Sequence, residues 1–201
     1  MEKIILYSDM DGVLTNFDAQ FERATNMTPE AFMKKEQKHL PYKESKDNFW
    51  KAVSKVSNFW TEMISMPEME MYWTGIMEMN PTILTAVPNG SEGGRAEIGK
   101  REWIAKKLGS HVPVIVVRLS DADHNISVKD KFAKGPQCIL IDDNYNYVKT
   151  WRTAGGNAVL FKNATQALKD FRRMTPWMTS ESTTELNSNA KTVSLATFLH
   201  H

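Results

Sequence analysis

Apolar residues along this chain fall into two patterns, short continuous runs and longer stretches with apolar positions three or four residues apart. Five of the runs are continuous and rich in β-branched residues, which is typical of parallel strands that are covered on both faces. They occupy residues 4–8, 82–87, 112–117, 138–141 and 158–161. Helical spacing occupies residues 94–108, 144–154 and 164–173. This alternation predicts an α/β fold with a doubly wound, Rossmann-like parallel sheet of about five strands.

A long segment interrupts the alternation directly after the first strand. It lacks a convincing strand pattern, and helical spacing covers residues 29–37, 46–57 and 68–78 within it. We therefore expect a small helical cap over residues 16–80, inserted into a core domain made of residues 1–15 and 81–173. Residues 174–201 are rich in Ser, Thr and Asn and are expected to form a C-terminal tail.

The bulk composition limits the classes of protein that remain. The chain has 201 residues, of which 41% are hydrophobic and 24% charged, as in ordinary soluble globular proteins. The net charge of +1 gives no electrostatic reason to expect binding to nucleic acid or to a membrane. Cys138 is the single cysteine and lies in an apolar run, which predicts a buried thiol and no internal disulfide. Because no apolar stretch is long enough to span a bilayer and the N-terminus lacks a signal-peptide pattern, we expect a cytoplasmic protein.

Two acids, Asp9 and Asp11, stand where the first predicted strand ends, and Gly12 follows them. Ligands of open α/β sheets bind at such strand ends. Two carboxylates there repel each other unless a cation or a proton lies between them. Mg²⁺ suits oxygen ligands, and one Asp would then be free to act as a covalent nucleophile. The alternative for this pattern alone is a strand followed by an Asp-rich turn.

Three further groups stand near other predicted strand ends. The second strand ends in Thr85 and Ala86, whose hydroxyl and backbone N–H are able to bind phosphate oxygens. Lys129 and Lys131 precede the fourth strand, where a lysine neutralises phosphate and crowded carboxylates. The fourth strand ends in Asp142-Asp143, which adds two acids to a cradle for a divalent cation.

With these residues in place, the chain resembles the haloacid dehalogenase (HAD) superfamily of phosphohydrolases over essentially residues 3–161. Four signatures occur in family order, namely DMDGVLTNFD from Asp9, ILT at 83–85, a lysine in VKDKFA at 128–133, and LIDD at 140–143. Within the superfamily, the DMDGVL form, the ILIDD ending and the helical insert look like the 5′(3′)-deoxyribonucleotidase group. Small phage and bacterial proteins of that type are similar.

The resemblance implies a role for each matching residue. Asp9 would be the nucleophile, and Asp11 the general acid and then the base. Mg²⁺ would be held by Asp9, the backbone carbonyl of Asp11 and one of Asp142 and Asp143, with the choice between the last two left open. Thr85, the Ala86 N–H and a lysine would bind the phosphoryl group. Lys129 fits the usual spacing slightly better than Lys131, and Arg95 or Lys100 is also able to reach a substrate phosphate.

Aromatic residues are concentrated in the predicted cap segment. Most aromatics at helical spacing belong to a core, so we expect only a minority of them to line a pocket for a nucleobase. Phe17, Trp60 and Trp73 are the candidates for that role. A cap over a small site also favours small substrates over macromolecular ones.

The resemblance implies a Mg²⁺-dependent phosphomonoester hydrolase, a 5′-nucleotidase of (deoxy)ribonucleoside monophosphates that works through an aspartyl-phosphate intermediate. The alternatives are a phosphatase of another small phosphometabolite, a nucleic-acid 3′-phosphatase, a phosphotransferase, and a non-catalytic nucleotide-binding module. The neutral charge weighs against nucleic-acid ends, since strand binding normally uses a basic groove. The nucleotidase group is often dimeric, so a homodimer is a further expectation. Base, sugar and 5′ or 3′ preference are left open.

Overall fold

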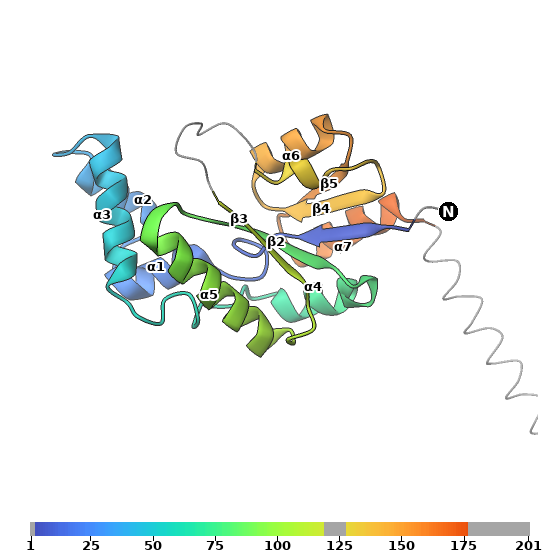
Figure 1. Cartoon of the computed structure of the whole chain (residues 1–201), viewed down its shortest axis with the longest axis horizontal. Helices are drawn as coiled ribbons and strands as arrows, with labels where there is room; N and C mark the ends of the chain where they lie inside the picture. The colour runs from blue at the N-terminus through green and yellow to red at the C-terminus, as the bar shows by residue number, and fades with distance from the viewer. Residues whose placement is uncertain (1–2, 119–127, 177–201) are drawn as a thin grey trace, which may run out of the picture.

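The structure is a computed structural model that describes residues 3–118 and 128–176. Its centre is a five-stranded parallel sheet with the strand order β3-β2-β1-β4-β5 (Figure 1). The strands are β1 (Ile5–Ser8), β2 (Thr82–Val87), β3 (Val114–Arg118), β4 (Cys138–Asp142) and β5 (Asn157–Leu160). Each predicted apolar run overlaps one of them, and the parallel order confirms the doubly wound α/β fold. Most of the predicted C-terminal tail lies outside the described residues.

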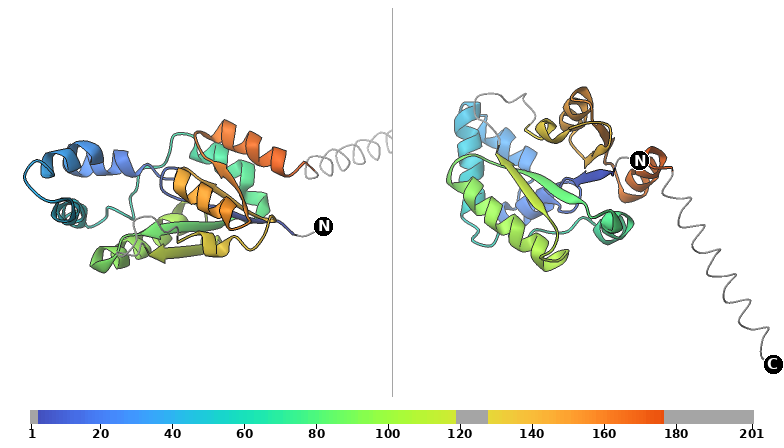
Figure 2. Two further views of the ribbon diagram at one scale, coloured as in Figure 1. Left: turned by 90° about the horizontal axis from the view of Figure 1, so that it is seen from above. Right: turned by 45° about the vertical axis from the view of Figure 1, so that its right-hand side comes forward.

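Helices cover both faces of the sheet, as the continuous apolar runs predict. The first face carries α4 (Met69–Ile76), α5 (Gly90–Lys107) and α7 (Ala164–Met174), and the second carries α6 (Tyr145–Thr153) (Figure 2). Two short 3₁₀ turns, η1 (Met77–Met79) and η2 (Asp130–Phe132), precede β2 and β4. Along β4, Ile139 and Ile141 pack on the first face and Cys138 and Leu140 on the second, so the whole strand is buried.

Three helices of the predicted cap, α1 (Phe17–Thr25), α2 (Pro29–Glu36) and α3 (Tyr42–Ser54), lie together at the left of Figure 1, beyond the carboxyl ends of the strands. The helical spacing predicted α2 and α3 but not α1. The local signal for α1 is Asn16, whose side-chain oxygen accepts a hydrogen bond of 2.9 Å from the backbone N–H of Ala19 and so caps the helix.

The chain passes from the sheet into these helices and later returns to it. The two connecting segments lie side by side and form hydrogen bonds with each other. Thr15 and Ser65 form a β-bridge. Beside it, the Asn16 N–H donates to the Ile64 carbonyl at 2.7 Å, and the Met66 N–H donates to the Leu14 carbonyl at 2.9 Å. The paired connecting segments therefore fix where the inserted helices join the core.

After the second connecting segment the chain returns to the sheet as α4, which packs beside α7 (Figure 2, left). The Tyr72 ring of α4 meets Phe161 with centroids 5.2 Å apart, and its hydroxyl lies 2.9 Å from the Ser8 hydroxyl of β1. The domain boundary at residue 80 stays a prediction, although the contacts of α4 are with core elements. In residues 3–118 and 128–176, every helix is too short or too polar to span a membrane.

Candidate active site

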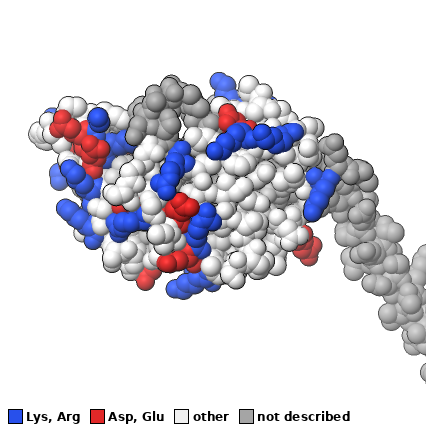
Figure 3. Space-filling model, in the orientation of Figure 1, with Lys and Arg blue, Asp and Glu red and all other residues white. Residues whose placement is uncertain are grey.

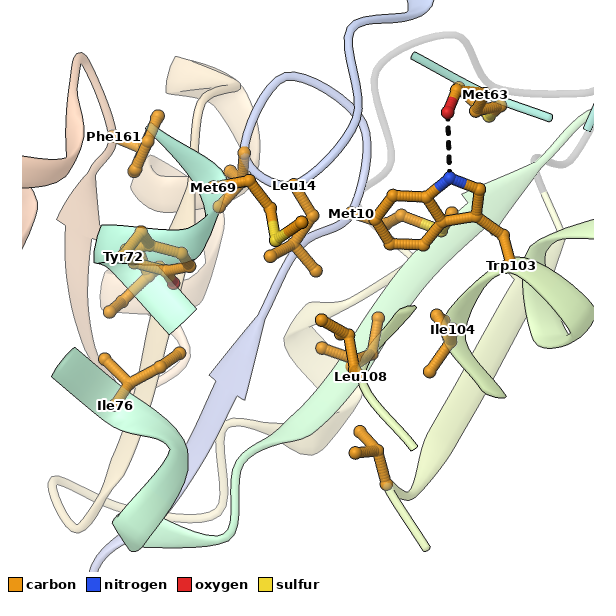
Figure 4. Close-up of a cluster of buried hydrophobic side chains, with 14 of the residues drawn as sticks. Met10, Leu14, Met63, Met69, Tyr72, Ile76, Trp103, Ile104, Leu108 and Phe161 are labelled. Carbon is orange, nitrogen blue, oxygen red and sulfur yellow. Dashed lines mark hydrogen bonds between the residues drawn. The ribbon is translucent and has the colours of Figure 1, made fainter. Parts of the chain in front are cut away.

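Asp9 and Asp11 flank a buried methionine directly after β1. The β1 pairing continues one residue further, since the Asp9 N–H donates to the Ile141 carbonyl at 2.8 Å. Met10 is fully buried and belongs to the hydrophobic cluster of Figure 4, whereas the carboxylates of Asp9 and Asp11 contact lysines. Gly12 then turns the chain with φ of 79°, in the left-handed region that favours glycine. The alternation of acid, methionine and acid therefore anchors both carboxylates to the core.

Asp9 shares a buried lysine with Asp142. Lys129 Nζ lies 2.8 Å from Asp9 Oδ1 and 2.7 Å from Asp142 Oδ2, and all three side chains are largely or fully buried. Backbone N–H groups complete the arrangement, with Met10 donating to Asp9 at 2.7 Å and Asn144 donating to Asp142 at 2.8 Å. The structure thus brings Lys129, η2 and the ends of β1 and β4 together.

With Asp143, whose side chain is more exposed, Asp9 and Asp142 form a crowded acid cluster. Burial raises the pKa of Asp9 to about 7, with Asp142 and Asp11 adding to the rise and Lys129 opposing it. Burial and the neighbouring Asp9 raise the pKa of Asp143 to about 6. Burial disfavours the ammonium of Lys129, but Asp9 and Asp142 outweigh that cost and raise its pKa. The cluster therefore holds more negative charge than one lysine balances.

Asp11 has a lysine of its own, from α5. Lys100 Nζ donates to Asp11 Oδ2 at 2.6 Å, to the Thr85 hydroxyl at 2.8 Å and to the Ala86 carbonyl at 2.7 Å. These contacts employ all three ammonium protons of a fully buried side chain. The other Asp11 oxygen accepts a hydrogen bond of 2.9 Å from the Thr15 hydroxyl. Lys100 therefore joins the predicted phosphate-binding strand end to the predicted general acid.

A divalent cation fits the acidic side of this edge. Carboxylate oxygens of Asp9, Asp142 and Asp143 all lie within 4.8 Å of one another. Such oxygens are the ligands that Mg²⁺ prefers, and burial raises the pKa of all three acids, which a bound cation would lower again. Gly12 leaves the space, because an added Cβ would collide with the carboxylate of Asp143. The Asp11 side chain is not part of this carboxylate group among the described residues, and its backbone carbonyl as a ligand stays a prediction.

Two of the sequence candidates lie away from this cluster. Lys131 is exposed, with Nζ 5.3 Å from the ring centroid of Phe132, so Lys129 is the lysine at the site. Trp73 lies on α4, where it lines a groove of about 500 Å³ that also includes Lys107 and Leu108. The helical turn explains its position, because the neighbouring Tyr72 faces β1 and directs Trp73 elsewhere.

The other two aromatic candidates lie side by side, and one of them, Trp60, lies beside Lys100. Lys100 Nζ is 5.4 Å from the ring centroid of Trp60, and the Trp60 ring lies 5.8 Å from Phe17. Trp50 of α3 completes the set, 6.3 Å from Phe17 and 6.5 Å from Trp60. Phe17 and Trp50 are only partly buried. Trp50 was not singled out from the sequence, since only the folded cap places it near the other two rings.

Comparisons with known proteins bear on the fold. No protein-family model matches the sequence, and no curated protein matches it. A HAD-superfamily hydrolase from Ehrlichia chaffeensis is similar in structure, with a TM-score of 0.51, 12% identity, and coverage of 87% of this chain and 99% of that one. A haloacid dehalogenase-like family hydrolase from Streptococcus pneumoniae gives a TM-score of 0.50, 13% identity, and coverage of 77% and 82%. The nucleotidase subgroup stays a prediction, and the fold of this chain is that of the haloacid dehalogenase-like hydrolases.

Proposed function

We propose that the protein is a Mg²⁺-dependent phosphomonoester hydrolase that acts on nucleoside 5′-monophosphates, preferentially the deoxy forms. One observation carries the proposal. Asp9 and Asp11 stand at one sheet edge, and each contacts a different buried lysine, Lys129 and Lys100. Two acids with separate cationic partners are suited to two separate roles in one reaction.

In the proposed reaction, Asp9 attacks the phosphorus and the ester P–O bond breaks. Asp11 supplies a proton to the leaving oxygen, and an aspartyl phosphate forms on Asp9. A water molecule then attacks that phosphorus and gives its proton to Asp11, which releases phosphate and restores Asp9. Lys129, 2.8 Å from Asp9, favours the ionised nucleophile, and Thr15 and Lys100 orient Asp11.

The acids Asp9, Asp142 and Asp143 would hold Mg²⁺, with the Asp11 carbonyl as a further ligand. When bound, the ion would supply charge stabilisation for the phosphoryl oxygens. Thr85 and Lys100, which are joined by a hydrogen bond of 2.8 Å, would bind the phosphoryl oxygens.

The substrate part of the proposal rests on the inserted helices. Trp60 lies beside Lys100, and Phe17 and Trp50 lie beside Trp60. Aromatic rings stack well on a nucleobase. Lys and Arg are interspersed with Asp and Glu over the face in Figure 3, which shows no single-sign basic band. That distribution favours a small substrate over a nucleic-acid strand.

The test is phosphate release from 5′- and 3′-mononucleotides, sugar phosphates and 3′-phosphorylated oligonucleotides, each with Mg²⁺ or with EDTA. Asp9→Asn runs beside the wild type, and Asp18→Asn, an exposed acid of α1, is the matched control. We expect Mg²⁺-dependent release from 5′-mononucleotides that Asp9→Asn abolishes and Asp18→Asn preserves.

Other outcomes change the proposal in defined ways. Phosphate release from sugar phosphates or oligonucleotide ends would support the proposed reaction and contradict the proposed substrate. Wild-type release that persists in Asp9→Asn would contradict the nucleophile. No release from any compound would contradict the hydrolase and favour a nucleotide-binding module.

A further inference from the structure

A buried hydrogen-bonded set joins the inserted helices to α5 outside the acid cluster. The indole Nε1–H of Trp60 donates to Glu92 Oε1 at 2.6 Å, and Arg95 Nη1 pairs with Glu92 Oε2 at 3.0 Å. Trp60 is 3% exposed and Glu92 is 6% exposed. A buried carboxylate is stable only when its oxygens have such partners. Both oxygens of Glu92 are therefore committed, one to the tryptophan and one to the arginine.

Arg95 extends this set to the end of α3. Its guanidinium donates to the backbone carbonyl oxygens of Ser54, Val56 and Ser57, at 2.9, 3.1 and 3.4 Å. Carbonyls at the carboxyl end of a helix lack partners within the helix and carry partial negative charge. One arginine of α5 therefore fixes the end of α3, which belongs to the inserted helices, against the core.

Trp60 connects this hydrogen-bonded set to the candidate active site through its contact with Lys100. Gly99 allows a close approach, because an added Cβ there would collide with the Cβ of Trp60. The Trp60 ring then lies against Lys100, with Nζ 5.4 Å from the ring centroid. Lys100 in turn donates to Asp11 and Thr85. The contacts run without interruption from the end of α3 to two predicted site residues.

We infer that Glu92 and Arg95 are positioning residues that act through Trp60 to hold Lys100 on Asp11 and Thr85. Their effect on turnover rests on the proposed function. Glu92 fixes the rotation of the Trp60 ring, and Arg95 fixes both Glu92 and the end of α3. Docking of the inserted helices and orientation of Asp11 are consequently coupled.

The kinetic test compares Glu92→Leu with the conservative Glu92→Gln on a deoxyribonucleoside 5′-monophosphate. Leu removes the acceptor of the Trp60 N–H, whereas Gln keeps one. We expect kcat to fall about tenfold in Glu92→Leu, because small displacements of groups around a reacting centre reduce rates by up to about 10²-fold. Glu92→Gln should stay within about threefold of the wild type. Glu97→Leu, which removes a half-buried partner of Arg101 and Arg118 from the same helix, is the matched control.

A double-mutant cycle tests the route through Trp60. Trp60→Phe keeps a ring over Lys100 and removes the indole N–H. If Glu92 acts through that N–H, Glu92→Leu should reduce kcat little further in the Trp60→Phe background, a non-additivity expected of directly contacting residues. Additive losses in kcat would overturn the inference, as would equal kcat values for Glu92→Leu and Glu92→Gln.

A second measurement needs no turnover, so its failure is distinguishable from failure of the proposed function. The indole ¹⁵N–H signal of Trp60 is identified by its loss in Trp60→Phe, and inorganic phosphate is then added with Mg²⁺. We expect phosphate to shift the Trp60 signal in the wild type and in Glu97→Leu, and to leave it unshifted in Glu92→Leu. The coupling would be overturned, even in an active enzyme, if phosphate did not shift the Trp60 signal of the wild type. It would also be overturned if phosphate shifted that signal equally in Glu92→Leu.

Discussion

Lys129 determines the charge balance of the candidate site at the scale of a single residue. Its ammonium contacts Asp9 and Asp142. The side chains of Lys129 and Asp142 have no exposed surface. Two buried carboxylates without the ammonium would face each other in a medium that screens charge poorly. Lys129 is therefore needed for the fold as well as for any reaction at Asp9.

Replacing Lys129 by methionine tests whether its ammonium is needed for stability. Removing one partner of a buried ion pair leaves uncompensated charge and costs about 3 kcal/mol or more. We expect the free energy of unfolding in urea to fall by about that amount in Lys129→Met at pH 8 without metal. Lys131→Met, at the exposed neighbouring lysine, should change it by less than about 0.5 kcal/mol. If both variants lost the same free energy of unfolding, Lys129 would not be the residue that balances the buried carboxylates.

The turn after β1 lies against the acid pair at the end of β4. Gly12 has φ of 79°, and the carboxylate of Asp143 occupies the space where a side chain at residue 12 would stand. Gly155, after α6, has φ of 95° and open space around its missing side chain. The two glycines share the backbone conformation and differ in what a methyl group would meet.

This difference predicts how alanine affects metal binding at each glycine. Both Gly12→Ala and Gly155→Ala carry the strain of a left-handed residue, about 1 kcal/mol. Only Gly12→Ala also displaces Asp143, so we expect Mg²⁺ affinity to fall on the order of tenfold there and to stay unchanged in Gly155→Ala. The measurement is thermal stability as a function of Mg²⁺ concentration. Parallel loss of Mg²⁺ affinity in both variants would assign the effect to backbone strain rather than to Asp143.

Sequence reasoning succeeded where an element carries its own signal. The strands were predictable because each overlaps a continuous apolar run, and β4 shows most fully the burial on both faces that such a run predicts. α5 begins at Gly90, four residues before the predicted start, because Gly90, Gly93 and Gly94 argue locally against a helix that packing stabilises. α1 has only nine residues and two buried side chains, too few for a clear periodic pattern.

The candidate site was predictable only in part, for a reason that belongs to the whole molecule. Asp9, Asp11 and Asp142 were predictable because parallel strands end at one edge. The contact of Lys100 with Asp11 joins residues 89 apart in the sequence, and the contact of Trp60 with Glu92 joins residues 32 apart. The first pair depends on how α5 packs on the sheet and the second on how the inserted segment docks on α5, and no local pattern encodes either arrangement. Trp73 is an aromatic residue of the predicted type, but it lines the groove beside Lys107 and Leu108 rather than the candidate site.

The acid cluster also makes the stability of the whole protein depend on pH and on Mg²⁺. Burial raises the pKa of Asp9 to about 7 and contributes to raising that of Asp143 to about 6, above the ordinary value of 3.8. Between about pH 4 and 7 the folded protein therefore holds protons that the unfolded chain has released. Stability should fall as pH rises through this window in EDTA, since the folded state binds more protons. Mg²⁺ favours the ionised carboxylates and should restore more stability at pH 8 than at pH 5.

Asp9→Asn separates this effect from the other titrating groups. Asn resembles the protonated Asp9 that the folded protein contains at pH 5, so the variant and the wild type should melt at similar temperatures there in EDTA. At pH 8 the wild type carries the buried charge, and Asp9→Asn should melt at least about 3 °C higher, which is roughly 1 kcal/mol for a domain of this size. Mg²⁺ should narrow or reverse that gap, because the ion stabilises only the protein that keeps the Asp9 carboxylate. An Asp9→Asn protein less stable than the wild type at pH 8 in EDTA would mean that Lys129 more than compensates the burial of Asp9.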